Sequence, residues 1–241
     1  MKLIRLGSEY GGWHLVDTGK LNKSLLVSGG LGEDATFDIE FINEFDGVAV
    51  AVDPTPRAIL HYYQIARAFG RPKTTIYSKS GKQPIEGYEL RKVDGRNFTL
   101  APLALWNRSG LMEFVPPDNP NFVSGRLAAT FAGGSVAEKS GSYVVPSTTL
   151  KELLDAYSLG APSILKLDIE GAGNAVLRHM CSEGIFPEQI LVELEELKFA
   201  DSAYADEATT LRDFLFSYGY ELISREGLNH SFFRTRCTAG R

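Results

Sequence analysis

The sequence predicts an α/β protein built on a mostly parallel sheet, and two observations carry this prediction. Apolar runs of strand length alternate along the chain with amphipathic segments of helix length, a pattern typical of a parallel sheet covered by crossover helices. The length of 241 residues and the apolar fraction of 44% suit one well-packed core. We therefore expect residues 1–241 to form a single domain.

The first half of the chain contains two strand–helix units. A strand over Leu25–Ser28 leads into a helix from about Asp34 to Phe45. A second strand over Gly47–Val52 leads into a helix that begins at Pro56. Thr55 can cap this helix, and proline suits the first helical position because its missing N–H has no partner there.

The middle of the chain adds a third strand and a long loop. The strand is predicted over Phe98–Leu105, and the loop runs from Pro116 to Pro146, where Pro, Gly, Ser and Ala dominate. Loops of this length in compact domains are commonly functional. We expect a lid that selects the substrate, with Ser124 and Arg126 as candidate substrate-binding residues; the alternative is a disordered surface insertion.

The last part of the chain repeats the strand–helix pattern and ends in a hairpin. A capping box at Thr149–Glu152 begins a helix, and a further helix passes through Val176 and Leu177. The closeness of the last two strands predicts an antiparallel pair. The remaining elements are strands Ser163–Leu167, Gln189–Leu194, Tyr220–Ser224 and Ser231–Arg234 and a helix near Ala208–Tyr218.

Composition excludes several classes of protein. The formal net charge is −5 and no run of basic residues occurs, which disfavours nucleic acid as a partner. The first residues lack the apolar region of a signal peptide and no membrane-spanning run follows, so we expect a cytoplasmic protein without a membrane partner. Cys181 and Cys237 lie far apart, which gives little support to a disulfide or a zinc site.

A glycine-rich turn after the first clear strand is the strongest local signal. Gly30-Leu31-Gly32-Glu33-Asp34-Ala35 has the G-x-G-x-x-A spacing of a dinucleotide site, and Asp53 follows about 20 residues later, as a ribose-binding acid should. The spacing allows NAD. However, the carboxylates of Glu33 and Asp34 oppose a pyrophosphate, whereas S-adenosylmethionine (SAM), a cation without phosphate, tolerates them. The alternative is that both acids only favour the helix dipole and face water.

Taken together, five segments resemble the FkbM-type methyltransferases, which depend on SAM. The resemblance implies a class I Rossmann-like fold with a seven-stranded sheet whose final strand is antiparallel. It also implies a hydroxyl acceptor on a sugar, a polyketide or a similar small metabolite. The segments are SGGLGEDATFDIEFI (28–42), AVDPTP (51–56), APLALWNRSG (101–110), ILKLDIEGA (164–172) and ILVELEEL (190–197).

The resemblance also assigns roles to residues of the cofactor site. It implies that Gly30 and Gly32 line the SAM turn and that Asp53 holds the ribose hydroxyls. It places Ala104 and Leu105 beside the adenine. We take Glu33, Asp34 and Asp168 as further candidate cofactor contacts.

The resemblance places Asp168 and Glu170 at the reacting end of the site. Methyl transfer needs an aligned acceptor, and a hydroxyl acceptor also needs a base, which a carboxylate of raised pKa or a bound divalent ion can provide. Both acids are therefore candidate catalytic residues. The alternative is that one caps the next helix and the other forms a salt bridge. Relatives usually carry an acid where this chain has Gly173-Asn174.

Further candidates for substrate binding follow the later strands. Glu193 and Glu195 close one strand, where solvated acids are the alternative, and His230 is expected in the loop of the C-terminal hairpin, where it is either a base over the site or simply exposed. Tyr10 to Trp13 either cover the ligand or belong to the edge of the core.

Three hypotheses follow from the sequence. The first is a SAM-dependent O-methyltransferase with a small hydroxyl acceptor. The second is an NAD-dependent oxidoreductase, and the third is a Rossmann-like nucleotide-binding protein without catalysis. The sequence leaves the oligomeric state and the need for a metal undetermined.

Overall fold

A computed structural model of the chain describes residues 1–117, 119, 124–130, 141–194 and 203–235. Its helices are α1 (Thr36–Phe45), α2 (Pro56–Ala66), α3 (Leu150–Ala156), α4 (Gly173–Ser182) and α5 (Ala203–Ser217), with short 3₁₀ turns at Ile85–Gly87 and Ala128–Thr130. No helix within these ranges is long and apolar enough to cross a membrane.

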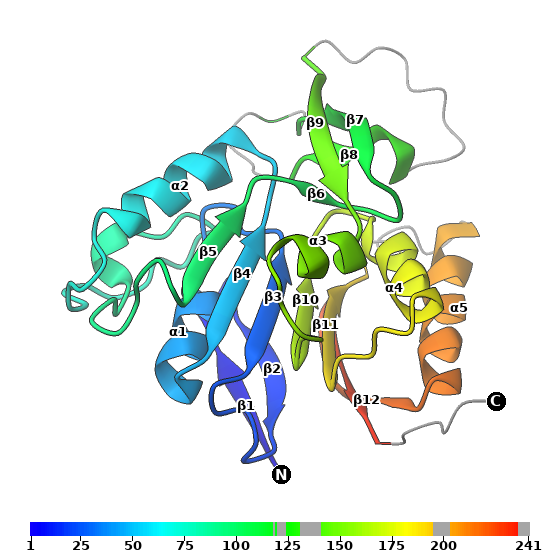
Figure 1. The fold of residues 1–241 in the computed structure, drawn as a ribbon, viewed down its shortest axis with the longest axis horizontal. Helices are drawn as coiled ribbons and strands as arrows, with labels where there is room; N and C mark the ends of the chain where they lie inside the picture. Colours follow the sequence, from blue (N-terminus) through cyan, green and yellow to red (C-terminus); the bar gives the residue numbers. More distant parts are fainter. Residues whose placement is uncertain (118, 120–123, 131–140, 195–202, 236–241) are drawn as a thin grey trace.

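A seven-stranded sheet forms the centre of the molecule (Figure 1). Its strands are β3 (Leu25–Gly29), β4 (Val48–Val52), β5 (Phe98–Ala101), β10 (Ile164–Leu167), β11 (Gln189–Glu193), β12 (Tyr220–Glu226) and β13 (Asn229–Arg234). They lie in the order β12-β13-β11-β10-β3-β4-β5, and β13 alone runs in the direction opposite to the other strands of this sheet. The predicted mostly parallel sheet and the antiparallel C-terminal pair are confirmed.

Both faces of the sheet are covered, because alternate residues of a strand point to opposite faces. Leu26 of β3 packs with α1 and α2 on one face, whereas Val27 packs with α3, α4 and α5 on the other. Figure 1 shows these helices on the two sides of the sheet. The predicted caps are also present: the Thr55 side chain accepts a hydrogen bond from the Ala58 N–H, and Thr149 forms a capping box with Glu152.

An antiparallel hairpin precedes the first predicted strand. It consists of β1 (Lys2–Leu6) and β2 (Trp13–Asp17), and Trp13 belongs to the same core cluster as α1. The buried side-chain amide of Gln189 in β11 accepts from the Val16 N–H (2.7 Å) and donates to the Val16 C=O (2.9 Å). This side chain therefore joins the hairpin to the central sheet.

A second, four-stranded sheet corrects two predictions about the middle of the chain. Its strands are β6 (Ala104–Leu105), β7 (Gly110–Val115), β8 (Arg126–Leu127) and β9 (Tyr143–Thr148), in the order β6-β9-β7-β8. The predicted single strand Phe98–Leu105 is wrong, because the chain turns at Pro102 and passes from β5 to β6 in the other sheet.

The candidate lid from Pro116 to Pro146 is likewise not a single loop. It supplies β8 and the first part of β9, so part of it is ordered by pairing with β7. Its residues 118, 120–123 and 131–140 lie outside the described residues. Figure 1 shows the small sheet beyond the end of the large sheet toward which β4 and β5 point.

Candidate active site

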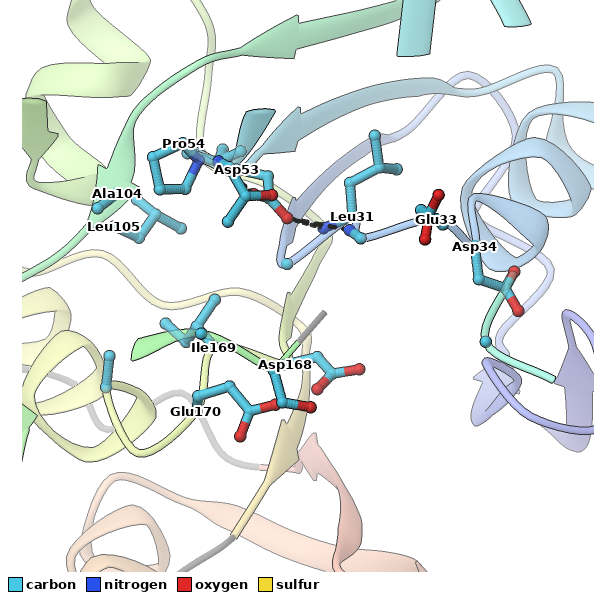
Figure 2. Close-up of a pocket in the computed structure, with 18 of the residues that line it drawn as sticks. Leu31, Glu33, Asp34, Asp53, Pro54, Ala104, Leu105, Asp168, Ile169 and Glu170 are labelled. Atoms are coloured by element: carbon cyan, nitrogen blue, oxygen red, sulfur yellow. Dashed lines mark hydrogen bonds between the residues drawn. The ribbon is translucent and has the colours of Figure 1, made fainter. Parts of the chain in front are cut away.

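A pocket opens where the strands of the large sheet end and the small sheet begins (Figure 2). The residues after β3, β4 and β10 form its floor, and side chains of the small sheet form its roof. The lining includes ten predicted site residues: Gly30, Gly32, Glu33, Asp34, Asp53, Ala104, Leu105, Ser124, Asp168 and Glu170. The structure thus brings together most of the residues that the sequence indicated.

The glycine turn lies against the end of β10. Gly30 has φ +83° and its N–H donates to the Val52 C=O at 3.0 Å. A Cβ atom at Gly30 would lie 1.9 Å from the carbonyl oxygen of Asp168. A side chain at this position is therefore excluded both by the backbone conformation and by the neighbouring strand.

Asp53 closes the turn through its side chain. Its Oδ2 atom accepts from the backbone N–H groups of Leu31 (3.0 Å) and Gly32 (2.9 Å), as Figure 2 shows. Its Oδ1 atom accepts from the N–H (2.8 Å) and the hydroxyl (2.7 Å) of Thr55. A carboxylate has about four acceptor positions, and the protein's own donors occupy that number here. Asp53 therefore holds the glycine turn in place, and its role in binding a ribose stays a prediction.

Glu33 and Asp34 both have protein partners. Glu33 forms ion pairs with Arg57 and with Lys82 (3.6 Å), and only 12% of its side chain is exposed. Asp34 accepts from the Ser8 hydroxyl (2.7 Å) and the Gln83 amide (3.0 Å). The alternative of two solvated acids is therefore wrong, because their partners come from three distant segments.

Asp34 also accepts from the N–H of Thr36 (2.9 Å), the first residue of α1. The Asp34 carboxylate therefore supports the start of this helix. The alternative is right in this one respect, since it expects the acids to stabilise the helix N-terminus. Both acids nevertheless line the pocket, so their role as cofactor contacts stays a prediction.

Asp168 and Glu170 lie on a sharp turn after β10. Glu170 has φ +48° and Gly171 has φ +79°, so a residue with a side chain adopts the left-handed conformation here. Such a conformation costs about 1 kcal/mol or more and is common at functional sites. Both residues line the pocket (Figure 2).

Neither acid caps the following helix. The N-cap residue of α4 is Ala172, and no side chain caps it. The alternative that one of the acids caps this helix is therefore wrong. The alternative that one of them forms a salt bridge agrees with the structure, because Oδ2 of Asp168 lies 3.9 Å from Nζ of Lys166.

Lys166 is the main pocket residue that sequence reasoning missed. Its side chain is 5% exposed and its Nζ atom donates to the Gly30 C=O at 3.0 Å. The sequence does not mark Lys166 as a site residue, because it lies within the apolar run SILKL, which indicates only a strand. A single charged residue inside a buried run was the available signal, since lysine is almost never fully buried without a partner.

The roof and one side of the pocket are apolar or aromatic. Phe114 and Leu127 of the small sheet line it together with Leu105. Tyr10 also lines it, and burial, then the charge of Asp168, raises the pKa of its hydroxyl. Trp13 belongs to the core, as one reading of the N-terminal segment expects, whereas Tyr10 reaches the pocket and its role in covering a ligand stays a prediction.

The remaining candidates lie elsewhere. Arg126 and Glu193 are not among the residues that line the pocket, although Arg126 stands between two that do, Gly125 and Leu127. Glu195 lies outside the described residues.

The prediction of a loop position for His230 is wrong. This residue is buried at 2% exposure in β13 opposite Val192, and its Nδ1 atom lies 2.7 Å from the Leu228 C=O. Burial lowers the pKa of its imidazole. The hairpin loop is shorter than predicted, because β13 begins at Asn229.

Among the residues that the structure describes, no group of three or more His, Cys, Asp and Glu side chains is arranged to hold a metal ion.

The architecture and the pocket define a class: an α/β protein with a pocket at the carboxyl ends of parallel strands, next to a glycine turn. The chain belongs to the FkbM methyltransferase family, because the model of the methyltransferase FkbM domain matches residues 48–222. This match confirms the resemblance found in the sequence and indicates methyl transfer as the activity. The glycine turn precedes the matched residues. A comparison with curated proteins found no match.

Proposed function

We propose that this chain is a SAM-dependent methyltransferase that methylates a hydroxyl group of a sugar, a polyketide or a similar small metabolite. The charge of the pocket carries this proposal. Five carboxylates line it, from Glu33, Asp34, Asp53, Asp168 and Glu170, against the single ammonium of Lys166 among the described lining residues. Such a surplus of acid favours a cationic ligand and opposes a pyrophosphate.

The lining also suits the separate parts of the donor. The glycine turn allows close approach of a ligand to the backbone, and Ala104 and Leu105 offer an apolar wall for an adenine ring. The strand order supports the class I Rossmann-like arrangement, because β5-β4-β3-β10-β11 follows the order 3-2-1-4-5 with its switch point at β3 and β10. The pocket lies beside this switch point.

The chain's own residues then have distinct tasks. When bound, SAM supplies an electrophilic methyl group, so the protein must align the acceptor and remove its proton. We assign proton removal to the carboxylate of Asp168 or Glu170, which lie on one turn at the pocket. The aromatic and apolar roof from Phe114 and Leu127 excludes water from the reacting groups.

The NAD-dependent oxidoreductase remains the competing proposal. The pairing of Glu33 with Arg57 and Lys82 weakens one part of the electrostatic objection to a dinucleotide. The other four carboxylates and the family membership still favour SAM. A binding protein without catalysis is the third possibility, and turnover is what separates it from the first.

Calorimetric titration with S-adenosylhomocysteine and with NAD tests the proposal. We expect micromolar binding of S-adenosylhomocysteine and none of NAD. Asp53→Ala should abolish binding, since it frees the glycine turn and removes the candidate ribose acceptor, whereas Asp155→Ala, an exposed acid on α3, should bind as the wild type does. Binding of NAD alone, or of neither ligand, would contradict the proposal.

A further inference from the structure

A group of buried polar side chains lies beneath the pocket floor. It consists of Ser28 on β3, Asp38 on α1 and Lys166 on β10, which are 0%, 1% and 4% exposed, with the indole of Trp13 beside them. Ser28 and Lys166 are register partners on adjacent strands, so their side chains share one face of the sheet. The sheet and the first turn of α1 thus enclose two residues of opposite charge.

Asp38 is an unusual residue for this place. Neither of its carboxylate oxygens forms a hydrogen bond of regular geometry among the described residues, although the hydroxyl of Ser28 is close enough to lower its pKa. Burial raises its pKa to about 6, and the positive charge of Lys166 is the largest opposing influence. Because a buried charge is costly unless it is compensated, Lys166 is the natural compensation for Asp38.

Lys166 also contacts both sides of the pocket floor. Its Nζ atom donates to the Gly30 C=O of the glycine turn at 3.0 Å and lies 3.9 Å from Oδ2 of Asp168. The same atom lies 5.8 Å from the ring centre of Trp13, whose side chain is buried. One ammonium group therefore joins the turn after β3 to the acid after β10.

We propose that Lys166 is a positioning residue of the donor site, which fixes the glycine turn relative to the Asp168 carboxylate, with Asp38 as its buried counter-charge. This inference rests on the proposed function. The hydrogen bond from Lys166 to Gly30 sets the position of the turn. The positive charge of Lys166 keeps the Asp168 carboxylate oriented at the end of β10. Asp38 acts through Lys166, because it is sealed beneath the floor.

Two variants separate this role from simple charge compensation. Lys166→Met removes the ammonium and leaves Asp38 uncompensated. The double variant Asp38→Asn/Lys166→Met also removes the uncompensated carboxylate of Asp38. Lys151→Met is the matched control, since this lysine is exposed on α3 and pairs with Asp155. Three quantities are measured: the melting temperature, the affinity for S-adenosylhomocysteine, and hydrogen exchange at the amides of residues 30–34 without ligand.

We expect Lys166→Met to melt at a lower temperature, to exchange faster at the turn and to bind S-adenosylhomocysteine at least about tenfold more weakly, equivalent to about 1.4 kcal/mol. The double variant should regain melting temperature but keep the fast exchange and the weak binding. The control should match the wild type in all three quantities.

Several results would overturn the proposal. A double variant that regains wild-type exchange and affinity would show that Lys166 only compensates Asp38. Wild-type exchange at the turn in Lys166→Met would show that the ammonium does not hold the turn. Failure of both variants to fold would show that Lys166 supports the fold as a whole rather than the donor site. If the wild type does not bind S-adenosylhomocysteine, the proposed function fails, while the exchange data still decide whether Lys166 holds the turn.

Discussion

Gly30 shows how one residue limits the geometry of the site. Its φ of +83° is matched by Gly70, with φ +82°, but a Cβ atom at Gly70 would meet nothing within 4 Å. Gly70→Ala therefore tests backbone strain alone, for which we expect a loss of about 1–2 kcal/mol in the free energy of unfolding. Gly30→Ala adds the collision with the Asp168 carbonyl, so we expect a much larger loss, of about 4 kcal/mol or more.

Denaturant unfolding of both variants checks this prediction. Equal losses for the two would mean that the turn can move away from β10, and that the close approach is not essential. For Gly30→Ala protein that still folds, we expect weaker binding of S-adenosylhomocysteine as well, since the turn must shift.

Residue-level prediction succeeded where the signal is local and failed where the partners are distant. The glycine turn and Asp53 follow from spacing, and the acids after β10 follow from their place at a strand end and from the family resemblance. The structure brings all of them to one pocket. The sequence could not show that Asp53 binds the turn amides or that Lys166 reaches Gly30, because these contacts join segments 21 to 136 residues apart. Those contacts exist only after the sheet has formed.

At the scale of elements, a buried hydrogen-bonded chain joins α2 to α1. The Ala35 N–H, at the start of α1, donates to the Tyr88 hydroxyl (3.1 Å), which lies 2.7 Å from Nε2 of His61 in α2. The tautomer of the imidazole sets whether Nε2 accepts from this hydroxyl or donates to it. Burial lowers the pKa of His61 to about 4, against the opposing charges of Glu33 and Asp34.

This arrangement predicts a pH dependence. The folded imidazole stays neutral down to about pH 4, whereas the unfolded one binds a proton below about 6.5, so protonation favours the unfolded chain in this interval. Stability contributed by His61 is complete above pH 6.5 and is lost as the pH falls toward 4. The shift from 6.5 to about 4 corresponds to about 3 kcal/mol.

Comparison of His61→Gln with the wild type isolates this effect. Asp38, with a raised pKa, has the opposite dependence between about pH 4 and 6, but it is present in both proteins. We expect the wild type to be the more stable at pH 7 and its advantage to shrink as the pH is lowered to about 4.5. Urea unfolding at several pH values measures the difference, and a constant difference would contradict the prediction.

Helices and strands could be predicted where the residues that determine them lie close together in the sequence. The caps at Thr55 and Thr149 placed two helix starts correctly, because a capping side chain acts within its own turn. Phe98–Leu105 failed because apolar residues continue across Pro102, and only pairing with β9 reveals that the chain has changed sheets. The β8 strand has two residues and no periodicity of its own, so its pairing with β7 could not be foreseen.

At the scale of the whole molecule, the main sheet was predictable and its additions were not. The alternation of buried strands and amphipathic helices determines the layered α/β core. The β1–β2 hairpin packs onto this core through Trp13 and Leu15, whereas the small sheet has a buried cluster of its own around Met112, Phe114 and Val145. They nevertheless complete the site, because the segment between β1 and β2 delivers Tyr10 and the small sheet delivers Phe114 and Leu127.

Gln189 tests how firmly the N-terminal hairpin is joined to that core. Its side chain is fully buried and pairs with both backbone groups of Val16, as a neighbouring strand would. Gln189→Leu preserves much of the volume but leaves the buried N–H and C=O of Val16 without partners, each at a cost of about 1–3 kcal/mol. We therefore expect a loss of about 2–5 kcal/mol in the free energy of unfolding.

Gln64→Leu, at an exposed position on α2, is the matched control and should change stability by no more than about 0.5 kcal/mol. Hydrogen exchange then locates the effect, and in Gln189→Leu we expect faster exchange over β1 and β2 than in the control. Because the hairpin carries Tyr10 to the pocket, S-adenosylhomocysteine should also bind more weakly to this variant. Unchanged exchange in the hairpin would mean that its other contacts, such as the packing of Trp13 and the hydrogen bond from Ser231 to the His14 C=O, hold it on the sheet.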